Sequence, residues 1–251
     1  MADVNVNHAT VAAPVVASTA APASESFGRR AFLLRHPQFA AMPAGAIDAL
    51  CAMALVRRLS DRAQLFGKGD APRAMYCVIE GCIRATGSSA DGREALLALM
   101  EPGCWFGESS ILDDAPHTYV ATAQGDCTLL AIPRRQMQAL LDAQPELYRW
   151  FVPMLCQRIR LSTRLLESNA LLPLEGKLAR RLIVLHENAL QGGAEAVRRT
   201  LPVSQENLSQ MIGTSRQSVN KVLKAWEQRG LIECRYGSIT LLDPAALERL
   251  A

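Results

Sequence analysis

Two short helical patterns of apolar residues, separated by a glycine, lie near the C-terminal end and give the clearest signal in the chain. Ser204 is a residue type that caps helix N-termini, and Glu206 follows in the first turn, where a negative charge is favoured. Gly213 permits a sharp turn after this helix, because glycine adopts positive φ without strain. The apolar face of the first helix consists of Leu208, Met211 and Ile212.

The second helix of this pair begins after the N-cap residue Ser215 and ends before Gly230. Its inward face consists of Val219, Val222, Leu223 and Trp226. A separate polar face predicts a helix-turn-helix whose second helix reads a DNA major groove. The residues that we expect to contact DNA are Ser215, Arg216, Gln217, Ser218, Lys221 and Lys224. The alternative is an ordinary helical hairpin with a solvated polar face.

The middle of the chain, from Val56 to Ile132, is a series of short apolar runs separated by glycine, proline and aspartate. Strand-like segments cover residues 74–79, 82–86, 95–99 and 128–132. Asp91 followed by Gly92 is typical of a hairpin tip. Many short strands at near-regular spacing predict an antiparallel barrel or jelly roll.

One segment, residues 103–118, interrupts the strand pattern. A strand ends at Gly107, and a single helical turn over residues 109–112 follows. Glycine lets a ligand approach the backbone closely, and the free N–H groups of a helix N-terminus bind phosphate. Glu108 can accept a hydrogen bond from a ribose hydroxyl. The alternative is that Gly107, Glu108 and Ser109 form an ordinary turn.

A helical period then runs over residues 145–172, with Pro153 either kinking the helix or marking its start. Positions at steps of three and four form a seam that consists of Val152, Leu155, Ile159, Ser162, Leu166 and Asn169. A heptad seam of this length predicts pairing with a second copy of the chain. The polar positions Ser162 and Asn169 can fix the register or touch a ligand. The alternative is that the seam packs on its own barrel.

Chain length and charge distribution fit a strand-rich first part and a separate part that holds the helix-turn-helix. The 251 residues allow two domains, and no apolar run is long enough to span a membrane. Residues 1–173 hold 16 basic and 16 acidic side chains, whereas residues 174–251 hold 11 basic and 8 acidic ones. The whole net charge of +3 therefore falls in the part with the helix-turn-helix, as expected for a nucleic-acid-binding domain.

The cysteines and the N-terminal segment indicate a cytoplasmic protein. Seven scattered cysteines in apolar surroundings predict reduced core residues, and no Cys-x-x-Cys or zinc-finger spacing occurs. Residues 1–26 are rich in small residues but lack a basic start, so they are a poor signal peptide. We expect them to be a disordered tail.

The order of these features resembles the Crp–Fnr superfamily of bacterial transcription regulators, of the catabolite activator type. The resemblance covers roughly residues 30–245 and rests on the segment that begins with Gly107, on the long helix and on the reading helix that begins after Ser215. It also includes the barrel glycines Gly69, Gly81, Gly92, Gly103 and Gly107.

The resemblance implies an α+β fold with an N-terminal cyclic-nucleotide-binding β-roll, or jelly roll, a long dimerisation helix and a C-terminal winged helix-turn-helix. The corresponding boundaries are 1–26 for the tail, 27–146 for the β-roll, 147–172 for the dimerisation helix and 173–251 for the DNA-binding domain. The wing falls at residues 231–242. The implied partners are a second copy of the chain, a palindromic double-stranded DNA site and, in an activator, RNA polymerase.

The resemblance carries ligand residues over only in part. Gly107, Glu108 and Ser109 match the positions where the phosphate and ribose of a cyclic nucleotide bind. The family then has Pro-Arg-Ser, in which the arginine pairs with the phosphate, but this chain has His117 and Thr118 after Pro116. Ser162 and Thr163 match the pair that contacts the base. We therefore expect weak cyclic AMP binding, and a cyclic mononucleotide or cyclic di-GMP as the effector.

Other function classes fit the sequence less well. Residues 1–50 contain no cysteine, which excludes the iron–sulfur oxygen sensors of the superfamily. For the haem sensors, His117 is one loose candidate as axial ligand, and we expect it to be a surface loop histidine. No catalytic constellation, metal cluster or P-loop indicates an enzyme. The remaining alternatives are a regulator with a degenerate pocket that needs no nucleotide, and a nucleotide-binding module that does not bind DNA.

Overall fold

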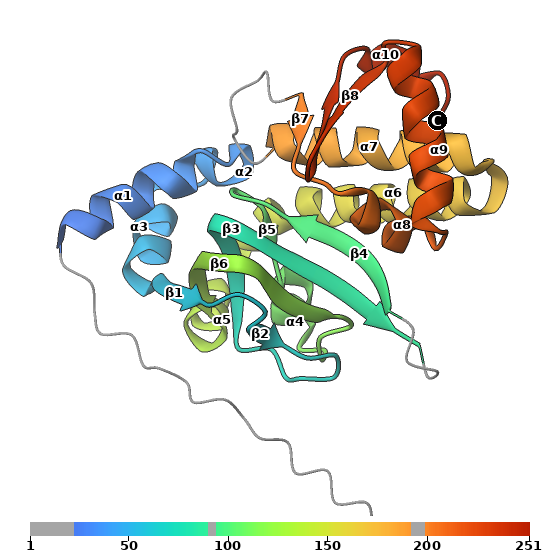
Figure 1. Cartoon of the computed structure of the whole chain (residues 1–251). Helices are drawn as coiled ribbons and strands as arrows, with labels where there is room; N and C mark the ends of the chain where they lie inside the picture. The colour runs from blue at the N-terminus through green and yellow to red at the C-terminus, as the bar shows by residue number, and fades with distance from the viewer. Residues whose placement is uncertain (1–22, 90–93, 192–198) are drawn as a thin grey trace, which may run out of the picture.

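The first helices and the β-roll of the computed structural model are shown in Figure 1, and the structure describes residues 23–89, 94–191 and 199–251. The helices that precede the first strand are α1 (Ala23–Leu34), α2 (Pro37–Ala40) and α3 (Ala44–Met53). Residues 1–22 of the expected tail lie outside the described residues. Residues 23–26, the last four positions of that tail, form the start of α1 instead.

One antiparallel sheet forms the β-roll and confirms the predicted jelly-roll type of fold. Its main strand order is β1-β6-β3-β4, with β2 pairing to β6 and β5 pairing to β3. The strands are β1 (Leu55–Leu59), β2 (Gln64–Phe66), β3 (Ala74–Ser88), β4 (Glu94–Met100), β5 (Trp105–Phe106) and β6 (Val120–Pro133). The predicted hairpin tip at Asp91 and Gly92 lies outside the described residues.

Strand β3 differs from the prediction of two strands over residues 74–79 and 82–86, because it runs unbroken through Gly81. Gly81 has φ +86°, and the pairing with β6 shifts register twice here, between Val78 and Glu80 and, across Gly81, between Glu80 and Cys82. A Cβ at Gly81 would lie 2.5 Å from the carbonyl oxygen of Asp126. Glycine therefore permits a bulge and a close approach of β6 inside one strand, rather than ending the strand.

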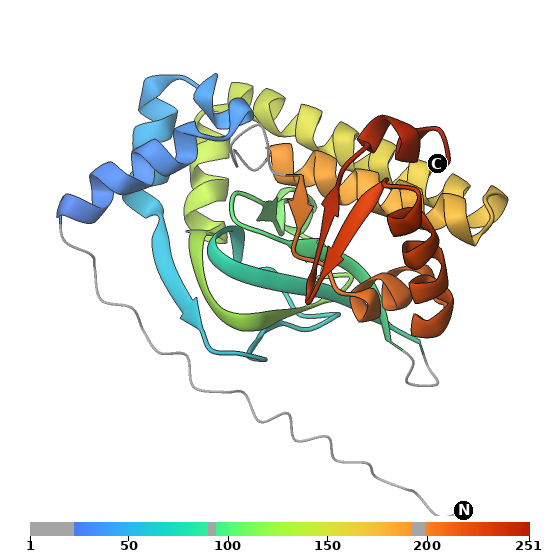
Figure 2. The same ribbon diagram turned by 45° about the horizontal axis from the view of Figure 1, so that its top comes forward.

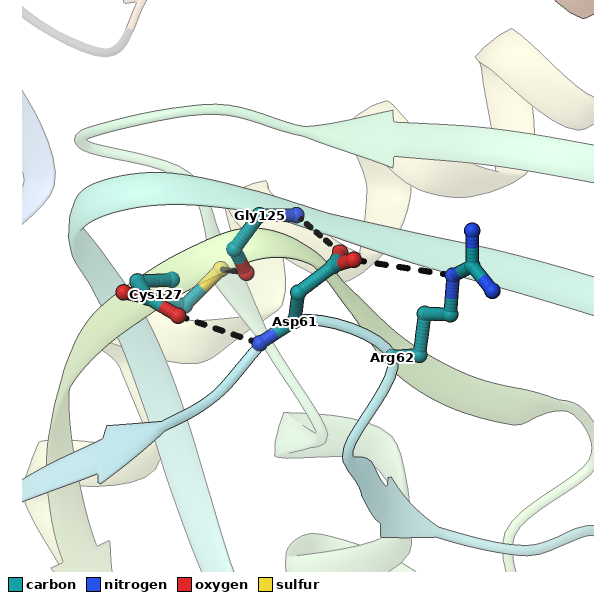
Figure 3. Close-up of polar contacts among 5 residues, drawn as sticks. Asp61, Arg62, Gly125 and Cys127 are labelled. Carbon is teal, nitrogen blue, oxygen red and sulfur yellow. Dashed lines mark hydrogen bonds and ion pairs between the residues drawn. The ribbon is translucent and has the colours of Figure 1, made fainter.

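The same bend in β6 is held by the turn between β1 and β2 (Figure 3). The Asp61 carboxylate accepts a hydrogen bond from the Gly125 N–H at 2.7 Å, and the Asp61 N–H donates to Asp126 Oδ1 at 3.1 Å. Arg62 Nε lies 3.5 Å from the other carboxylate oxygen of Asp61. The Asp61 carboxylate thus satisfies the Gly125 N–H, where β6 is out of register with β3, and Asp126 satisfies the Asp61 N–H in the turn.

The segment after the sheet leads into the long helix. Helix α4 (Glu108–Asp113) separates β5 from β6, and α5 (Arg134–Ala143) and a 3-10 turn (Pro145–Leu147) lead to α6 (Tyr148–Leu171). Pro153 lies inside α6, in its second turn. Helix α6 packs beside α7 (Leu174–Gln191), as Figures 1 and 2 show.

The C-terminal domain confirms the predicted winged helix-turn-helix. It consists of α7, β7 (Thr200–Leu201), α8 (Gln205–Ile212), α9 (Arg216–Gln228), β8 (Ile232–Arg235), β9 (Ser238–Leu241) and α10 (Pro244–Glu248). The wing strands β8 and β9 pair, and β7 adds a third strand that the pattern did not predict. Trp226 is fully buried in this domain, and its Nε1 donates to Glu175 on α7 at 2.8 Å.

The two domains share apolar contacts. Leu96 and Leu99 of β4 belong to the same buried cluster as Leu208 and Met211 of α8. The seven cysteines are free thiols, of which Cys51, Cys77 and Cys127 are buried. In the described ranges no helix is both long and apolar enough to cross a membrane.

Candidate functional site

The caps of the helix-turn-helix form as the sequence predicts. Ser204 Oγ accepts the Asn207 N–H at 3.0 Å, and the Asn207 side chain accepts the Ser204 N–H in return, which completes a capping box. Gly213 ends α8 with φ +74°. Ser215 caps α9 by accepting the Ser218 N–H at 3.1 Å. The turn between the helices is thereby fixed by local hydrogen bonds.

The polar face of α9 is free. Arg216, Gln217, Lys221 and Lys224 are all exposed, and no described residue holds any of them by a hydrogen bond or an ion pair. The hydroxyls of Ser215 and Ser218, by contrast, lie 2.8 Å apart and bond to each other. Three cations and an amide on one exposed helix face suit the base edges and phosphates of a major groove.

In the β-roll, the predicted ligand segment begins at Gly107, whose backbone conformation favours glycine. Gly107 has φ +81°, and a Cβ there would lie 3.3 Å from the Ala74 carbonyl oxygen on β3. Glu108 follows as the first residue of α4 and is 2% exposed, whereas Ser109 is exposed. The structure thus turns the carboxylate inward and the serine hydroxyl outward.

Glu108 is paired with a residue that the sequence analysis did not single out. Arg158 on α6 forms an ion pair with Glu108 Oε1 and also donates to the Trp105 carbonyl oxygen. Lost solvation lowers the pKa of the Arg158 guanidinium, but Glu108, Cys104 and Tyr119 together outweigh this effect and raise it. Arg158 lies one turn before Ser162 on the same helix face, and that spacing is the signal that could have identified it.

The second carboxylate oxygen of Glu108 has no hydrogen-bond partner among the described residues, although it is buried. Burial and Glu108 together raise the pKa of the Tyr119 hydroxyl. The pKa of the Cys104 thiol, raised by burial above all, is about 11. Both groups therefore stay protonated beside Glu108 at neutral pH. A buried acceptor without a partner is unfavourable, and a ligand with a hydroxyl donor would satisfy it.

His117 is not the surface loop histidine that we expected. It is 3% exposed and stacks face to face on Phe66, with ring centroids 3.6 Å apart and planes inclined by 10°. Its backbone is held as well, because its N–H donates to the Asp70 carbonyl and its carbonyl accepts from Gly69. The prediction was wrong because Phe66, distant in sequence, covers the ring. Thr118, the next residue, is exposed.

Burial lowers the pKa of His117, against an opposing effect of Asp70. The imidazole is therefore neutral at pH 7, and one of its faces is covered by Phe66. A neutral, stacked ring does not replace the charged fork of an arginine as a phosphate partner.

The seam of α6 is exposed in the single chain. Val152, Ile159 and Leu166 are 53%, 66% and 71% exposed, and Leu155 is half-buried. Ser162 and Thr163 are exposed on the same helix, and Thr163 Oγ1 donates to the Ile159 carbonyl at 3.0 Å. The seam therefore does not pack on its own β-roll, and Ser162 and Thr163 make no described contact with Glu108.

A separate hollow of about 780 Å³ lies between the ends of β3 and β4 and helix α8. Its walls include Gly87, Ser88, Glu94, Glu206 and Gln210. None of the predicted ligand residues lines it. Within the described ranges, no group of three or more histidine, cysteine and acidic side chains is placed to hold a metal ion.

Comparison with known proteins agrees with this architecture. Residues 56–144 match the cyclic nucleotide-binding domain family, and residues 176–250 match the Crp-like helix-turn-helix domain family. The chain is 30% identical to the cyclic AMP receptor protein of Thermus thermophilus over 187 residues, which cover 74% of this chain and 83% of the relative. It is 29% identical to a CRP-like cAMP-activated global transcriptional regulator of Mycobacterium tuberculosis, over 74% of this chain and 84% of that protein.

Solved structures show the same fold. A CRP/FNR-family transcriptional regulator of Thermus thermophilus aligns with a TM-score of 0.59 at 27% identity, over 78% of this chain and 98% of that one. FixK2 of Bradyrhizobium japonicum aligns with a TM-score of 0.69 at 18% identity, over 78% of this chain and 96% of that one.

Proposed function

Because the chain belongs to the Crp–Fnr superfamily of transcription regulators, we propose that it acts as a homodimer that binds a palindromic DNA site under the control of a small effector. The observation that carries DNA reading is the free polar face of α9, set on a capped helix-turn-helix. Selection of binding sites from random duplexes with the full chain tests this proposal, because a palindromic sequence should emerge.

The exposed seam of α6 supports the dimer. Three large apolar side chains on one helix face are unfavourable in water, and a second α6 would cover them. A parallel pair of α6 helices would relate two reading helices by a two-fold axis. In dimers of this type the half-sites lie one DNA turn apart, about 34 Å.

Glu108 supports an effector in the β-roll. Its free oxygen suits a hydroxyl donor such as that of a ribose, and the relatives that are named for cyclic AMP bind a ribose-containing nucleotide. The neutral His117 removes the phosphate partner that cyclic AMP would use. We therefore propose that cyclic AMP binds weakly, and that the effector is a cyclic mononucleotide or a cyclic dinucleotide such as cyclic di-GMP.

A second candidate is a regulator of the same family that binds DNA without a nucleotide. It is favoured by the stack of His117 on Phe66 and by the ion pair that already occupies one oxygen of Glu108. In either case the ion pair of Arg158 with Glu108 links the β-roll to α6. A ligand that bound Glu108 would shift the population of dimer arrangements through this helix. If the protein is an activator, RNA polymerase is its further partner.

The first prediction concerns cyclic AMP. The wild type should bind it no more tightly than micromolar in a calorimetric titration, with cyclic GMP and cyclic di-GMP titrated in parallel. His117→Arg should gain affinity by about 10- to 150-fold, since a charged phosphate contact contributes about 1.5–3 kcal/mol. His117→Gln is the matched control, because it also replaces the imidazole ring but adds no charge. Sub-micromolar cyclic AMP binding by the wild type would contradict the assignment of His117.

The parallel titrations also separate the two candidates. Binding of any of the three nucleotides, together with a rise in DNA affinity, supports the effector-controlled regulator. DNA binding without response to any of them supports the nucleotide-independent one.

The second prediction concerns the dimer. Ile159→Glu and Leu155→Glu place like charges at facing seam positions and should dissociate the dimer into monomers. Sedimentation velocity at micromolar concentration measures this directly. Leu55→Glu is the matched control, because Leu55 is 46% exposed but lies on β1. A wild type that sediments as a monomer would rule out the proposed pairing.

The third prediction concerns the reading helix. Arg216→Ala should cost about 1–3 kcal/mol of DNA binding and relax one base position, because a bidentate arginine reads guanine. Lys224→Ala should weaken binding to all sequences alike and reduce the salt slope by about one, as for a phosphate contact. Gln217 suits an adenine, so Gln217→Glu should shift the selected base toward cytosine. An unchanged selected site with Gln217→Glu would remove Gln217 from the base contacts.

A further inference from the structure

The DNA-reading domain is seated on the edge of the β-roll. Leu96 and Leu99 of β4 are 2% and 6% exposed and share one apolar cluster with Leu208 and Met211 of α8. In both views of the molecule α8 lies against β4 (Figures 1 and 2). A displacement of β4 would therefore act directly on α8, the first helix of the helix-turn-helix.

A buried arginine lies in this joint. Arg181 on α7 is 8% exposed, and its guanidinium donates to two backbone carbonyls in different domains. Nη1 donates to the Leu97 carbonyl on β4 at 3.4 Å, and Nη2 donates to the Met211 carbonyl on α8 at 3.2 Å. One side chain on α7 thus bridges the β-roll and the helix-turn-helix.

The positive charge of Arg181 is compensated by backbone carbonyl groups rather than by a carboxylate. No described carboxylate lies within ion-pair distance of it, and burial lowers its pKa. Met211 is the next-to-last residue of α8, where the final carbonyls lack partners within the helix and carry partial negative charge. Arg181 therefore binds the C-terminal end of α8 one residue before Ile212, and the turn that sets the direction of α9 follows at once.

A second arginine crosses the same joint at the surface. Arg84 on β3 donates from Nη2 to Gln210 Oε1 on α8 at 2.8 Å and from Nη1 to Gln124 at 3.2 Å. Gln210 in turn donates to Glu206 at 3.2 Å. Helix α8 is thus held at two points, by the buried Arg181 and by Arg84 nearer the surface. Two such contacts restrain the rotation of α8 as well as its distance from β4.

We propose that Arg181 is a positioning residue for DNA recognition: by fixing the end of α8 to β4 it sets the direction of α9, and hence the half-site spacing that the dimer accepts. This inference rests on the proposed dimeric DNA binding. Two rigidly held reading helices fit one spacing, because both half-sites must be engaged together. Loosened helices would tolerate several spacings.

The test compares DNA affinities of the full chain for the selected palindrome and for duplexes with one or two base pairs inserted between its half-sites. The wild type should prefer the selected spacing strongly. Arg181→Met keeps the length and most of the volume but removes the donors, and the preference should fall at least tenfold. Arg181→Lys keeps the charge and one set of donors, and should restore part of the preference.

Arg180→Met is the matched control on the same helix. Arg180 donates to the Ala251 carbonyl at 2.8 Å, within the C-terminal domain, so its removal should leave the spacing preference unchanged. Arg84→Met acts at the surface of the joint and should relax the preference in the same direction by a smaller factor. It provides the same readout if Arg181→Met does not fold.

The outcomes separate this inference from the proposed function. A wild type that selects no palindrome overturns the proposed function and this inference with it. A wild type that prefers one spacing, with Arg181→Met preferring it equally, overturns this inference alone. A uniform loss of affinity at every spacing in Arg181→Met also overturns it, because a purely structural defect has that effect.

Discussion

The carboxylate of Glu108 is the constraint on which the β-roll and the long helix both depend. It is almost fully buried, and a buried carboxylate needs a partner for its charge. Arg158 supplies that partner from α6, so the start of α4 and the middle of α6 cannot move independently. Removing one partner of a buried pair costs about 3–5 kcal/mol, and the 45% exposure of the Arg158 side chain places this pair at or below the lower end of that range. The second oxygen of Glu108 remains for a ligand.

The reading helix is connected to the β-roll by two routes. One runs from Glu108 through Arg158 along α6 and into α7, which carries Glu175 against Trp226 of the DNA-binding domain. The other is the direct contact of β4 with α8, where Arg181 joins the two. In the proposed dimer, the first route would connect an effector bound at Glu108 to the seam of α6, and the second holds α8 against the sheet. The first route reaches Trp226 within α9, and the second reaches the end of α8, immediately before the turn that leads into α9.

Local signals in the sequence were sufficient for the parts of the fold that are held locally. Caps and glycines at fixed offsets predicted the helix-turn-helix, and Ser204 and Ser215 make the expected hydrogen bonds. Contacts between distant segments could not be read in this way. The pattern predicts two strands on either side of Gly81, because nothing in its neighbourhood indicates that β6 approaches it so closely. The burial of His117 and the pairing of Arg158 depend likewise on residues about 50 positions away.

The link between Glu108 and the long helix is tested most directly by native-state hydrogen exchange of the α6 amides in the wild type, Glu108→Gln, Arg158→Met and the double variant. If the ion pair joins the two elements, each single change should accelerate exchange in α6, and the double variant should exchange no faster than the more affected single one. Such non-additivity is the mark of residues in direct contact. Unaltered exchange of α6 in Glu108→Gln, or effects of the two changes that simply add, would contradict the link.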